Sequence, residues 1–366
     1  MIFCANPRSQ YLARKDEIDI AIAEVLDSSQ YVLGEQVANF EYNFASFIGV
    51  DYCVGVANGT DALELALRSL EISSNDEVIT VSHTAVATVS AIQLVGATPV
   101  LVDVDEKSYT LDPSILADAI TPKTKAIIAV HLYGHACDLD AILEIANSHN
   151  IPVIEDVSQA HAGEYKERKL GTYGLMSCFS CYPTKNLGAI GDAGVVCTDH
   201  PDIASKVRML REYGWKERYL SEITGRNSRL DELQAAILSV KLKYLDNDTT
   251  KRIEIANLYK ENLQKCPLVL PVEKHNVKHA YHLFAILTDR RDELLSYLNE
   301  RNIFPGIHYP YPIHLQKGYK NLIKTVEPLT VTERIASQEL SLPLYPELSH
   351  DEVLHVCETI SEFYCQ

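Results

Sequence analysis

Positive charge is scarce in this sequence, which has 33 Lys and Arg residues against 50 Asp and Glu residues and a formal net charge of −17 at pH 7. A nucleic-acid-binding surface needs a basic excess to neutralise phosphates, and anionic membranes attract basic segments for the same reason. We therefore expect neither nucleic acid nor a membrane as a partner. An anionic small molecule stays compatible with this composition, because a few local hydrogen-bond donors decide such binding.

Long apolar runs are also missing. No stretch approaches the ~18 apolar residues that a membrane-spanning helix requires, and the N-terminal residues Met1 to Arg8 lack the charged and then apolar order of a signal peptide. The nine cysteines are an odd number without regular spacing, so we expect reduced thiols in a cytoplasmic protein. Cys178 and Cys181 form a C-x-x-C pair, but no second pair or nearby histidine completes a site, and we expect no metal.

The sequence does contain a regular alternation of short β-rich runs and longer helical runs between about residues 50 and 200. The β-rich runs are nearly continuous in Val and Ile, which indicates strands buried on both faces of a mainly parallel sheet covered by helices. Such a sheet binds ligands outside the carboxyl ends of its strands. The expected strands lie at residues 54–56, 77–81, 99–104, 126–130 and 152–156, and the expected helices at 61–70, 84–95 and 141–149.

The alternation of predicted strands and helices ends after residue 229. Two long helical segments follow, at residues 230–245 and 249–264, and then a strand, a helix, proline-rich loops and a terminal helix from His350. A chain of 366 residues is long enough for two domains. We place the boundary in the helical region and predict a large domain of residues 1–245 and a smaller α+β domain of residues 246–366.

Two segments could bind a phosphate group. Ala57-Asn-Gly-Thr60 lies between a strand and a helix, where Gly59 lets a ligand approach the backbone and Thr60 can cap the helix and offer its hydroxyl. The N–H groups and dipole of the first helical turn favour an anion there, although an ordinary helix start explains these residues equally well. Ser180 is a second candidate, and in an extended segment it shares one face with Tyr182.

A lysine and an acid follow two of the predicted strands. Lys185 comes after a short apolar strand and a Tyr-Pro-Thr turn, and Asp156 closes the run Val-Ile-Glu-Asp. An aspartate at this position can simply cap the next turn, but its pairing with Lys185 favours a functional role. A pyridoxal phosphate (PLP) enzyme requires these two groups: the lysine forms the Schiff base, and the acid keeps the pyridine nitrogen protonated through a charge-assisted hydrogen bond.

Eight short segments extend the pattern over nearly the whole chain, from about residue 6 to residue 360. They lie at residues 58–63, 82–88, 131–134, 155–161, 182–189, 191–194, 225–236 and 306–310. Together they resemble the sugar aminotransferases of the DegT/DnrJ/EryC1/StrS family, which use PLP and have the fold type I of aspartate aminotransferase. The resemblance implies an α/β protein whose large domain has a mainly parallel, seven-stranded sheet and whose smaller C-terminal domain is α+β.

The resemblance also implies roles for individual residues around the cofactor. Lys185 would bind PLP covalently, Asp156 would pair with the pyridine nitrogen, and Gln159 would lie near the ring. Gly59, Thr60 and Ser180 would hold the phosphate. Asn227 would reach the phosphate of the neighbouring subunit, so a homodimer with the active site at its interface is expected.

The substrate side of the site is described by a second group of residues. By resemblance, Tyr182, His308 and Tyr309 would line the sugar pocket, and we add Arg218 and Arg229 as candidate cations for the diphosphate of a sugar nucleotide. The chain departs from many relatives at Ala85, where an aromatic residue stacks on the cofactor. We expect His83 or another side chain to cover that face, or the face to be open to substrate.

The implied reaction is a ping-pong transamination in deoxyamino sugar or glycan biosynthesis. L-glutamate would donate the amino group, and a nucleotide-linked keto-sugar would accept it. The favoured substrate is a dTDP-3-keto-6-deoxyhexose, giving a dTDP-3-amino-3,6-dideoxyhexose, while a 4-keto or UDP-linked sugar stays open. Lys185 would act as a base, so its pKa should lie well below the ~10.4 of free lysine because of burial and cationic surroundings.

Two other functions use the same fold. A PLP-dependent sugar dehydratase of this type has a histidine in place of the Schiff-base lysine, whereas Lys185 is present here. A non-catalytic regulator would have no need of Lys185, Asp156 and the phosphate ligands. Both alternatives are therefore less favoured than an aminotransferase.

Overall fold

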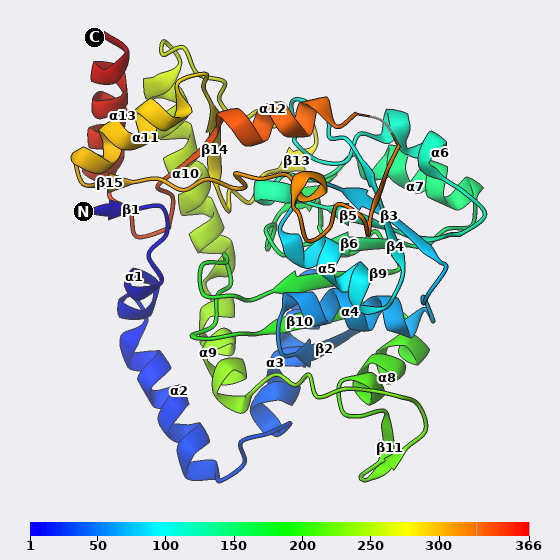
Figure 1. Ribbon diagram of the computed structural model, residues 1–366. Helices are drawn as coiled ribbons and strands as arrows, with labels where there is room; N and C mark the ends of the chain where they lie inside the picture. Colours follow the sequence, from blue (N-terminus) through cyan, green and yellow to red (C-terminus); the bar gives the residue numbers. More distant parts are fainter. Residues whose placement is uncertain (327, 366) are drawn as a thin grey trace.

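A sheet of eight strands forms the centre of the larger part of the protein (Figure 1). The computed structural model describes residues 1–326 and 328–365. The strands lie in the order β16-β4-β3-β5-β6-β9-β10-β2, and all neighbours run parallel except β10, which is antiparallel to both β9 and β2. Their bounds are β2 (Tyr52–Val56), β3 (Glu77–Val81), β4 (Thr98–Val102), β5 (Thr124–Val130), β6 (Val153–Asp156), β9 (Met176–Ser180), β10 (Gly194–Thr198) and β16 (Lys324–Thr325).

The sheet confirms the predicted α/β fold and its mainly parallel strands. Seven of its strands come from residues 52–198, as expected, and the eighth, β16, is added at the edge by two residues from the C-terminal part. Lys324 supports this strand, because its Nζ lies 2.6 Å from Oε1 of Glu77 on β3. A strand of two residues carries no alternation of apolar and polar positions, so the sequence pattern does not reveal it.

Helices cover this sheet, and β3 and β10 are buried at every position, as strands with both faces covered must be. Helices α4, α5 and α8 contact one another or the strands beside them, and α2, α3 and α9 form a second group of neighbours. The helices of this part are α1 (Pro7–Leu12), α2 (Lys15–Ser28), α3 (Glu35–Ile48), α4 (Gly59–Ser69), α5 (Val86–Leu94), α6 (Leu116–Ala119), α7 (Leu139–Ser148), α8 (Pro201–Leu210) and α9 (Glu232–Leu242).

A second hydrophobic cluster lies in the C-terminal part and is separate from the core around the large sheet. It is built on α10 (Leu245–Leu263), β14 (Phe284–Leu287), α11 (Arg291–Glu300), β15 (Ile303–Phe304), β17 (Glu339–Leu342) and α13 (His350–Cys365). The N-terminal strand β1 (Ile2–Phe3) pairs with β15, and α12 (Thr330–Gln338) begins with two N–H groups bonded to the Asp103 carboxylate beyond β4. The division at residue 245 stays a prediction.

Short elements complete the described chain. A hairpin of β11 (Trp215–Glu217) and β12 (Leu220–Ser221) extends away from the large sheet (Figure 1). The others are β7 (Glu164–Tyr165), β8 (Arg168–Lys169), β13 (Val277–Lys278) and the 3-10 turns at Pro113–Ile115, Leu132–Gly134 and Ile313–Leu315. Within residues 1–326 and 328–365, no helix combines the length and the apolar character needed to cross a bilayer.

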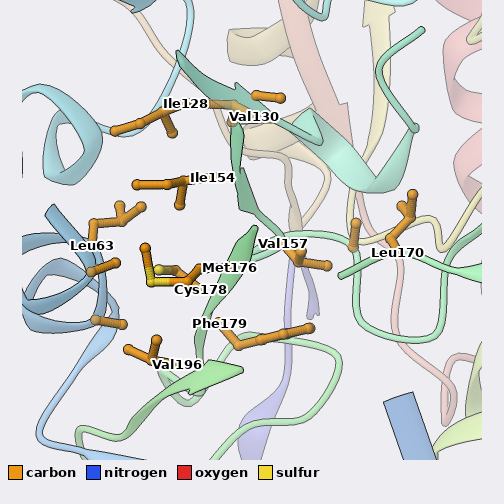
Figure 2. Packing of buried hydrophobic residues seen from close by; sticks show 14 of the residues in the cluster. Leu63, Ile128, Val130, Ile154, Val157, Leu170, Met176, Cys178, Phe179 and Val196 are labelled. Atoms are coloured by element: carbon orange, nitrogen blue, oxygen red, sulfur yellow. The ribbon is translucent and has the colours of Figure 1, made fainter. Parts of the chain in front are cut away.

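Core packing fixes the ends of the strands relative to helix α4. Figure 2 shows Leu63 of α4 facing side chains of the central strands, among them Ile154 of β6, Met176 of β9 and Val196 of β10. All four are at most 1% exposed. Because the interior is close-packed, this contact sets the distance between the start of α4 and the carboxyl ends of β6 and β9.

The cysteines depart in part from expectation. Cys53 of β2 and Cys197 of β10 lie directly opposite each other, with their Cα atoms 4.3 Å apart, and form a disulfide. The expectation of reduced thiols is therefore wrong for this pair, whose separation of 144 residues gives no sign of pairing in the sequence. The other seven cysteines are free, and Cys178 and Cys181 are both buried.

Candidate active site

A pocket of about 480 Å³ opens where the carboxyl ends of β5, β6 and β9 meet the N-terminus of α4. This is the edge at which a parallel sheet binds its ligands. Seven of the predicted site residues line the pocket, although they come from segments far apart in the sequence. They are Gly59, Thr60, Asp156, Gln159, Ser180, Tyr182 and Lys185.

The start of α4 forms one end of the pocket. Asn58 caps the helix, since its Oδ1 accepts the N–H of Asp61 at 2.9 Å. The expectation that Thr60 is the cap is therefore wrong; Thr60 lies in the first turn, and its side chain lines the pocket. A Cβ on Gly59 would lie 2.6 Å from Cβ of Ser180, so only glycine fits here. The first-turn N–H groups of a helix favour a phosphate.

Asp156 is the last residue of β6, and its carboxylate is held in a fixed orientation. Its Oδ2 accepts the Thr88 hydroxyl of α5 at 3.0 Å, and its Oδ1 accepts the N–H of Ser158 at 3.1 Å. Since Thr88 donates its proton to Asp156, it accepts from the Thr84 hydroxyl at 3.0 Å. Two hydrogen bonds leave acceptor positions of the carboxylate unused, and Asp156 lines the pocket.

Lys185 follows a turn in which its own N–H donates to the carbonyl of Tyr182 at 2.8 Å. Burial lowers the pKa of its amine to about 8, although the negative charge of Asp156 raises it. This confirms the predicted direction of the shift. The predicted cationic surroundings do not contribute, because the groups that act on the Lys185 amine besides burial are Asp156 and Cys181, and both raise its pKa.

Gln159 connects the pocket to Tyr309, a residue from the C-terminal part of the chain. Its Oε1 accepts the backbone N–H of Tyr133 at 2.8 Å, and its Nε2 donates to the Tyr309 hydroxyl at 3.0 Å. The Tyr309 hydroxyl therefore accepts from Gln159 and keeps its own proton for another partner. His308 lies beside it, and the carbonyl of His308 accepts the Tyr133 hydroxyl.

His83 is buried and does not line the pocket. Its Nε2 lies 2.7 Å from the Tyr133 hydroxyl. Because Tyr133 donates its proton to the His308 carbonyl, Nε2 of His83 must be the donor, and burial lowers the pKa of this ring to about 4, so it is neutral. A role of His83 at the cofactor stays a prediction. Tyr133 is not among the predicted site residues, although it lies in the segment 131–134, because a tyrosine at this position gives no sign of which residues it bonds.

Like His83, the predicted residues His308 and Tyr309 do not line the pocket. Three more predicted residues, Asn227, Arg218 and Arg229, lie away from the pocket of their own chain. Asn227 is exposed and accepts from Nε of Arg229 at 2.9 Å. Arg218 lies in the β11–β12 hairpin, with its guanidinium 5.0 Å from the ring centre of Tyr219. None of the three lines the pocket, so their roles stay predictions.

The segment around Asn227 is nevertheless tied to helix α4. Arg226 lies 3.2 Å from Asp61 and forms a second ion pair with Glu64. The Ser228 hydroxyl donates to Asp61 at 2.6 Å and accepts the N–H of Ala57 at 3.2 Å. These contacts fix Asn227 relative to the first turn of the helix that ends the pocket.

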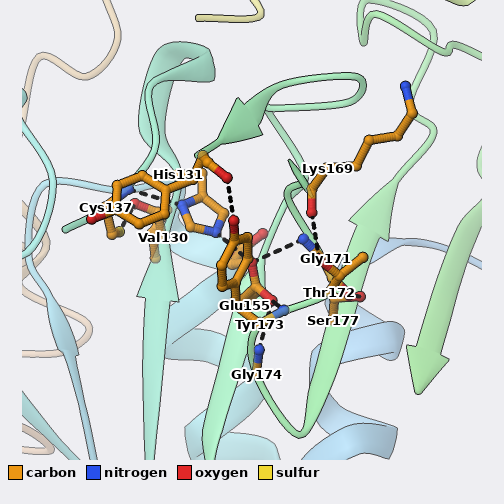
Figure 3. A network of polar contacts seen from close by, with 12 residues as sticks. Val130, His131, Cys137, Glu155, Lys169, Gly171, Thr172, Tyr173, Gly174 and Ser177 are labelled. Carbon is orange, nitrogen blue, oxygen red and sulfur yellow. Dashed lines mark hydrogen bonds and ion pairs between the residues drawn. The ribbon is translucent and has the colours of Figure 1, made fainter. Parts of the chain in front are cut away.

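Glu155 precedes Asp156 and is the centre of a buried polar network (Figure 3). Its carboxylate is fully buried and accepts three backbone N–H groups and a histidine ring nitrogen. Burial alone would raise the pKa of Glu155, but these hydrogen bonds outweigh it and lower the pKa. The three N–H groups are those of Gly171, Tyr173 and Gly174, at 2.9, 2.7 and 2.8 Å.

The histidine of this network is His131, at the carboxyl end of β5. Its Nε2 lies 3.1 Å from Glu155, and its Nδ1 accepts the N–H of Cys137 at 3.0 Å. Burial lowers the pKa of the His131 ring, but Cys137 and Glu155 outweigh it and raise the pKa to about 10. A nitrogen that accepts a hydrogen bond carries no proton, however, so the bond from the Cys137 N–H to Nδ1 favours a ring protonated at Nε2 alone. Its backbone N–H bonds the carbonyl of Asp156 at 3.1 Å, and the network thereby holds the strand end that carries Asp156.

The chain is similar to proteins of one family along nearly its whole length. A family model described as the DegT/DnrJ/EryC1/StrS aminotransferase family matches residues 13–361. The chain is 45% identical to the dTDP-3-amino-3,6-dideoxy-alpha-D-galactopyranose transaminase of Aneurinibacillus thermoaerophilus, over 95% of each protein. It is 43% identical to the dTDP-3-amino-3,4,6-trideoxy-alpha-D-glucose transaminase of Streptomyces venezuelae, over 97% of this chain and 94% of that protein. The crystal structure of S. venezuelae DesV in complex with a ketimine intermediate matches with a TM-score of 0.97 and 42% identity, over 100% of this chain and 99% of that one.

Proposed function

Because this chain belongs to the DegT/DnrJ/EryC1/StrS aminotransferase family, we propose that it transfers an amino group from L-glutamate to C3 of a dTDP-linked 3-keto-6-deoxyhexose. The family is PLP-dependent, and its members transaminate nucleotide-linked keto-sugars. The product would be a dTDP-3-amino-3,6-dideoxyhexose.

The presence of Lys185, Asp156 and the start of α4 in one pocket carries this proposal. Gly59 leaves free the space that a side chain would fill, and the helix N-terminus beside it suits a phosphate. Asp156 has acceptor positions to spare for a protonated ring nitrogen. Lys185 supplies the amine. This set of groups fits PLP.

Each residue of the pocket then has a chemical task. Bound PLP supplies an electron sink for the substrate's α-carbon. The Lys185 amine takes up a proton and returns it, which its pKa of about 8 allows near neutral pH. Asp156 would hold a proton on the ring nitrogen, and Gln159, which lines the same pocket, would lie beside the ring. Gly59, Thr60 and Ser180 bind the phosphate.

The names of the relatives support the choice of sugar. Both named transaminases act on a dTDP-linked hexose that carries its amino group at C3, while their sugars differ at C4. We therefore propose C3 amination of a dTDP-sugar and leave the configuration at C4 open. Tyr182, His308 and Tyr309 would face the sugar, and Arg218 and Arg229 would face the diphosphate.

We also propose that the enzyme is a cytoplasmic homodimer. Asn227 is exposed and lies outside the pocket of its own chain, so it is available to a neighbouring subunit. Arg226 and Ser228 hold it in place through α4. In a homodimer Asn227 would complete the phosphate site of the partner.

A panel of keto-sugars tests the proposal. The PLP-loaded protein is incubated with L-glutamate and, in turn, a dTDP-3-keto, a dTDP-4-keto and a UDP-3-keto sugar, with formation of 2-oxoglutarate as the readout. We expect turnover with the dTDP-3-keto sugar and a product with nitrogen at C3 by NMR. Lys185→Ala is the control and should show no turnover. Turnover with the 4-keto or UDP sugar alone would refute the proposed substrate.

A further inference from the structure

Glu339 on β17 is a buried carboxyl group near the predicted sugar-binding residues. Its side chain is 0% exposed. Oε2 accepts the backbone N–H of His308 at 2.5 Å, and Oε1 contacts the Ser341 hydroxyl. The described residues supply no cationic side chain that pairs with this carboxyl group. Its two hydrogen-bond partners, the His308 N–H and the Ser341 hydroxyl, are both neutral. Both belong to a chain of hydrogen bonds from Glu339 through Ser341 to the ring of His308.

The path continues through the ring of His308. Nδ1 of His308 lies 2.9 Å from the Ser341 hydroxyl. Within the described part of the chain, Nε2 has no hydrogen-bond partner, so it is free to meet a ligand or water. His308 is close enough to the pocket for the charge of Lys185, together with the larger effect of burial, to lower the pKa of its ring to about 4. The ring is therefore neutral, and one of its nitrogens carries a proton.

The single proton of the Ser341 hydroxyl links the two groups. When Glu339 is ionised, Ser341 must donate its hydrogen bond to Oε1. The Ser341 oxygen then accepts a hydrogen bond from Nδ1–H of His308, so the proton of the ring is on Nδ1 and Nε2 is an acceptor. When Glu339 is protonated, it can donate to Ser341, which donates in turn to Nδ1, so the proton of His308 sits on Nε2. The second state has one more proton than the first, and His308 is neutral in both.

We propose that Glu339, acting through Ser341, sets which nitrogen of His308 carries the proton, and so whether Nε2 meets the substrate as a donor or as an acceptor. Uptake of one proton at Nε2 shifts the Nδ1 proton to Ser341 and the Ser341 proton to Glu339, which balances the transfer. Glu339 is a positioning residue, because it acts on the substrate only through His308. The proposal rests on the proposed function in one respect, that His308 contacts the sugar.

The surroundings of Glu339 set the pH at which the relay changes state. Burial raises the pKa of Glu339 to about 8, against the opposing hydrogen bonds of Ser341 and His308 and the positive charge of Arg291 on α11. Other titratable residues interact with Glu339 from the elements packed around it, and their side chains are all neutral near pH 8. They are Cys4, Tyr109, Tyr133, Tyr309 and His308. Below pH 8 Nε2 is therefore a donor, and above pH 8 it is an acceptor.

Nitrogen NMR on the full-length, PLP-loaded protein labelled with ¹⁵N-histidine tests the relay, because the shifts of Nδ1 and Nε2 report directly which one carries the proton. His308→Gln identifies its signals by their loss. In the unmodified protein we expect the proton on Nε2 at pH 7 and on Nδ1 at pH 9, with a midpoint near pH 8. In Glu339→Gln the amide oxygen must accept the His308 backbone N–H, so the NH2 group faces Ser341 and can only donate to its hydroxyl. This variant should keep the proton on Nε2 throughout. Ser341→Ala should remove the pH dependence.

Glu347→Gln is the matched control, because Glu347 is a partly buried acid of the C-terminal part whose pKa is also raised by burial. Within the described residues it forms no hydrogen bond with His308. It should leave the midpoint unchanged. A His308 signal that ignores pH in the unmodified protein, or that still switches in Glu339→Gln, overturns the relay. Neither outcome involves the sugar, so the test does not depend on the proposed substrate.

Kinetics with the accepted keto-sugar then test the contact of His308 with the substrate. If Nε2 donates to the sugar, KM should rise about tenfold from pH 7 to pH 9 in the unmodified protein, because the donor state falls to about one part in eleven one unit above its pKa. Glu339→Gln should show a flat KM. An NMR switch with no change in KM would support the relay and refute the sugar contact assigned to His308.

Discussion

Replacing Gly59 by alanine sets two effects of opposite sign against each other. Alanine favours a helix over glycine by about 1 kcal/mol, so in open space the substitution would stabilise the start of α4. At this position the new Cβ would lie 2.6 Å from Cβ of Ser180 and 3.1 Å from its Cα. Overpacking of this kind costs about 1–3 kcal/mol. Because part of the clash is with backbone, we expect the cost to exceed the gain.

The larger consequence concerns PLP. The methyl group fills the space next to the first-turn N–H groups, and a loss of about 1–3 kcal/mol in phosphate binding corresponds to a roughly 5- to 150-fold higher Kd. Titration of the apo protein with PLP, followed by the absorbance of the Lys185-bound cofactor, measures this change. Gly318→Ala is the matched control, since a Cβ there meets nothing within 4 Å. A Gly59→Ala protein that is more stable and binds PLP normally would refute the reasoning.

Three further predictions concern the pocket and the dimer. The rate at which apo protein takes up PLP should rise about fivefold from pH 7 to pH 8, because only a neutral Lys185 amine with its pKa near 8 reacts; a pH-independent rate would contradict this. Thr88→Val removes a hydrogen bond to the Asp156 carboxylate and should lower kcat/KM about tenfold, whereas Thr80→Val, which loses only a bond to a strand carbonyl, should not. Co-expressed Lys185→Ala and Asn227→Ala chains should form mixed dimers with one working site, which combines the intact Lys185 of one chain with the intact Asn227 of the other. If mixed dimers are as inactive as the pure variant dimers, Asn227 does not act across the interface.

Much of this molecule follows from local patterns in the sequence. The Val and Ile runs predict the central strands, and the helices predicted at residues 61–70 and 141–149 are found at Gly59–Ser69 and Leu139–Ser148. The ends of elements are less certain, because several residues compete for the same cap. Asn58 and Thr60 can both cap a helix, and the extended backbone of Asn58 decides between them.

The contacts that lie behind the pocket have no such local signal. His83, Tyr133 and His308 meet through hydrogen bonds that span 50 and 175 residues, and Glu339 reaches His308 from a strand of the other hydrophobic cluster. His83 and His308 are predicted as site residues, but nothing in the residue types around these positions indicates which partners they bond. The contacts become visible only once the C-terminal part packs on the large sheet.

The ion pairs and hydrogen bonds between residues 226–228 and helix α4 link the phosphate position of this chain to the position of Asn227. Arg226 and Ser228 bind Asp61 and Glu64 in the first turns of the helix that faces this chain's own phosphate position. Asn227 lies between Arg226 and Ser228 in the sequence. If Asn227 reaches the phosphate of the partner subunit in a homodimer, as proposed, a shift of α4 when its own pocket fills would also move Asn227 in the partner's pocket. The two sites of the dimer would then be coupled, so that binding of PLP at one site would change the affinity for PLP at the other.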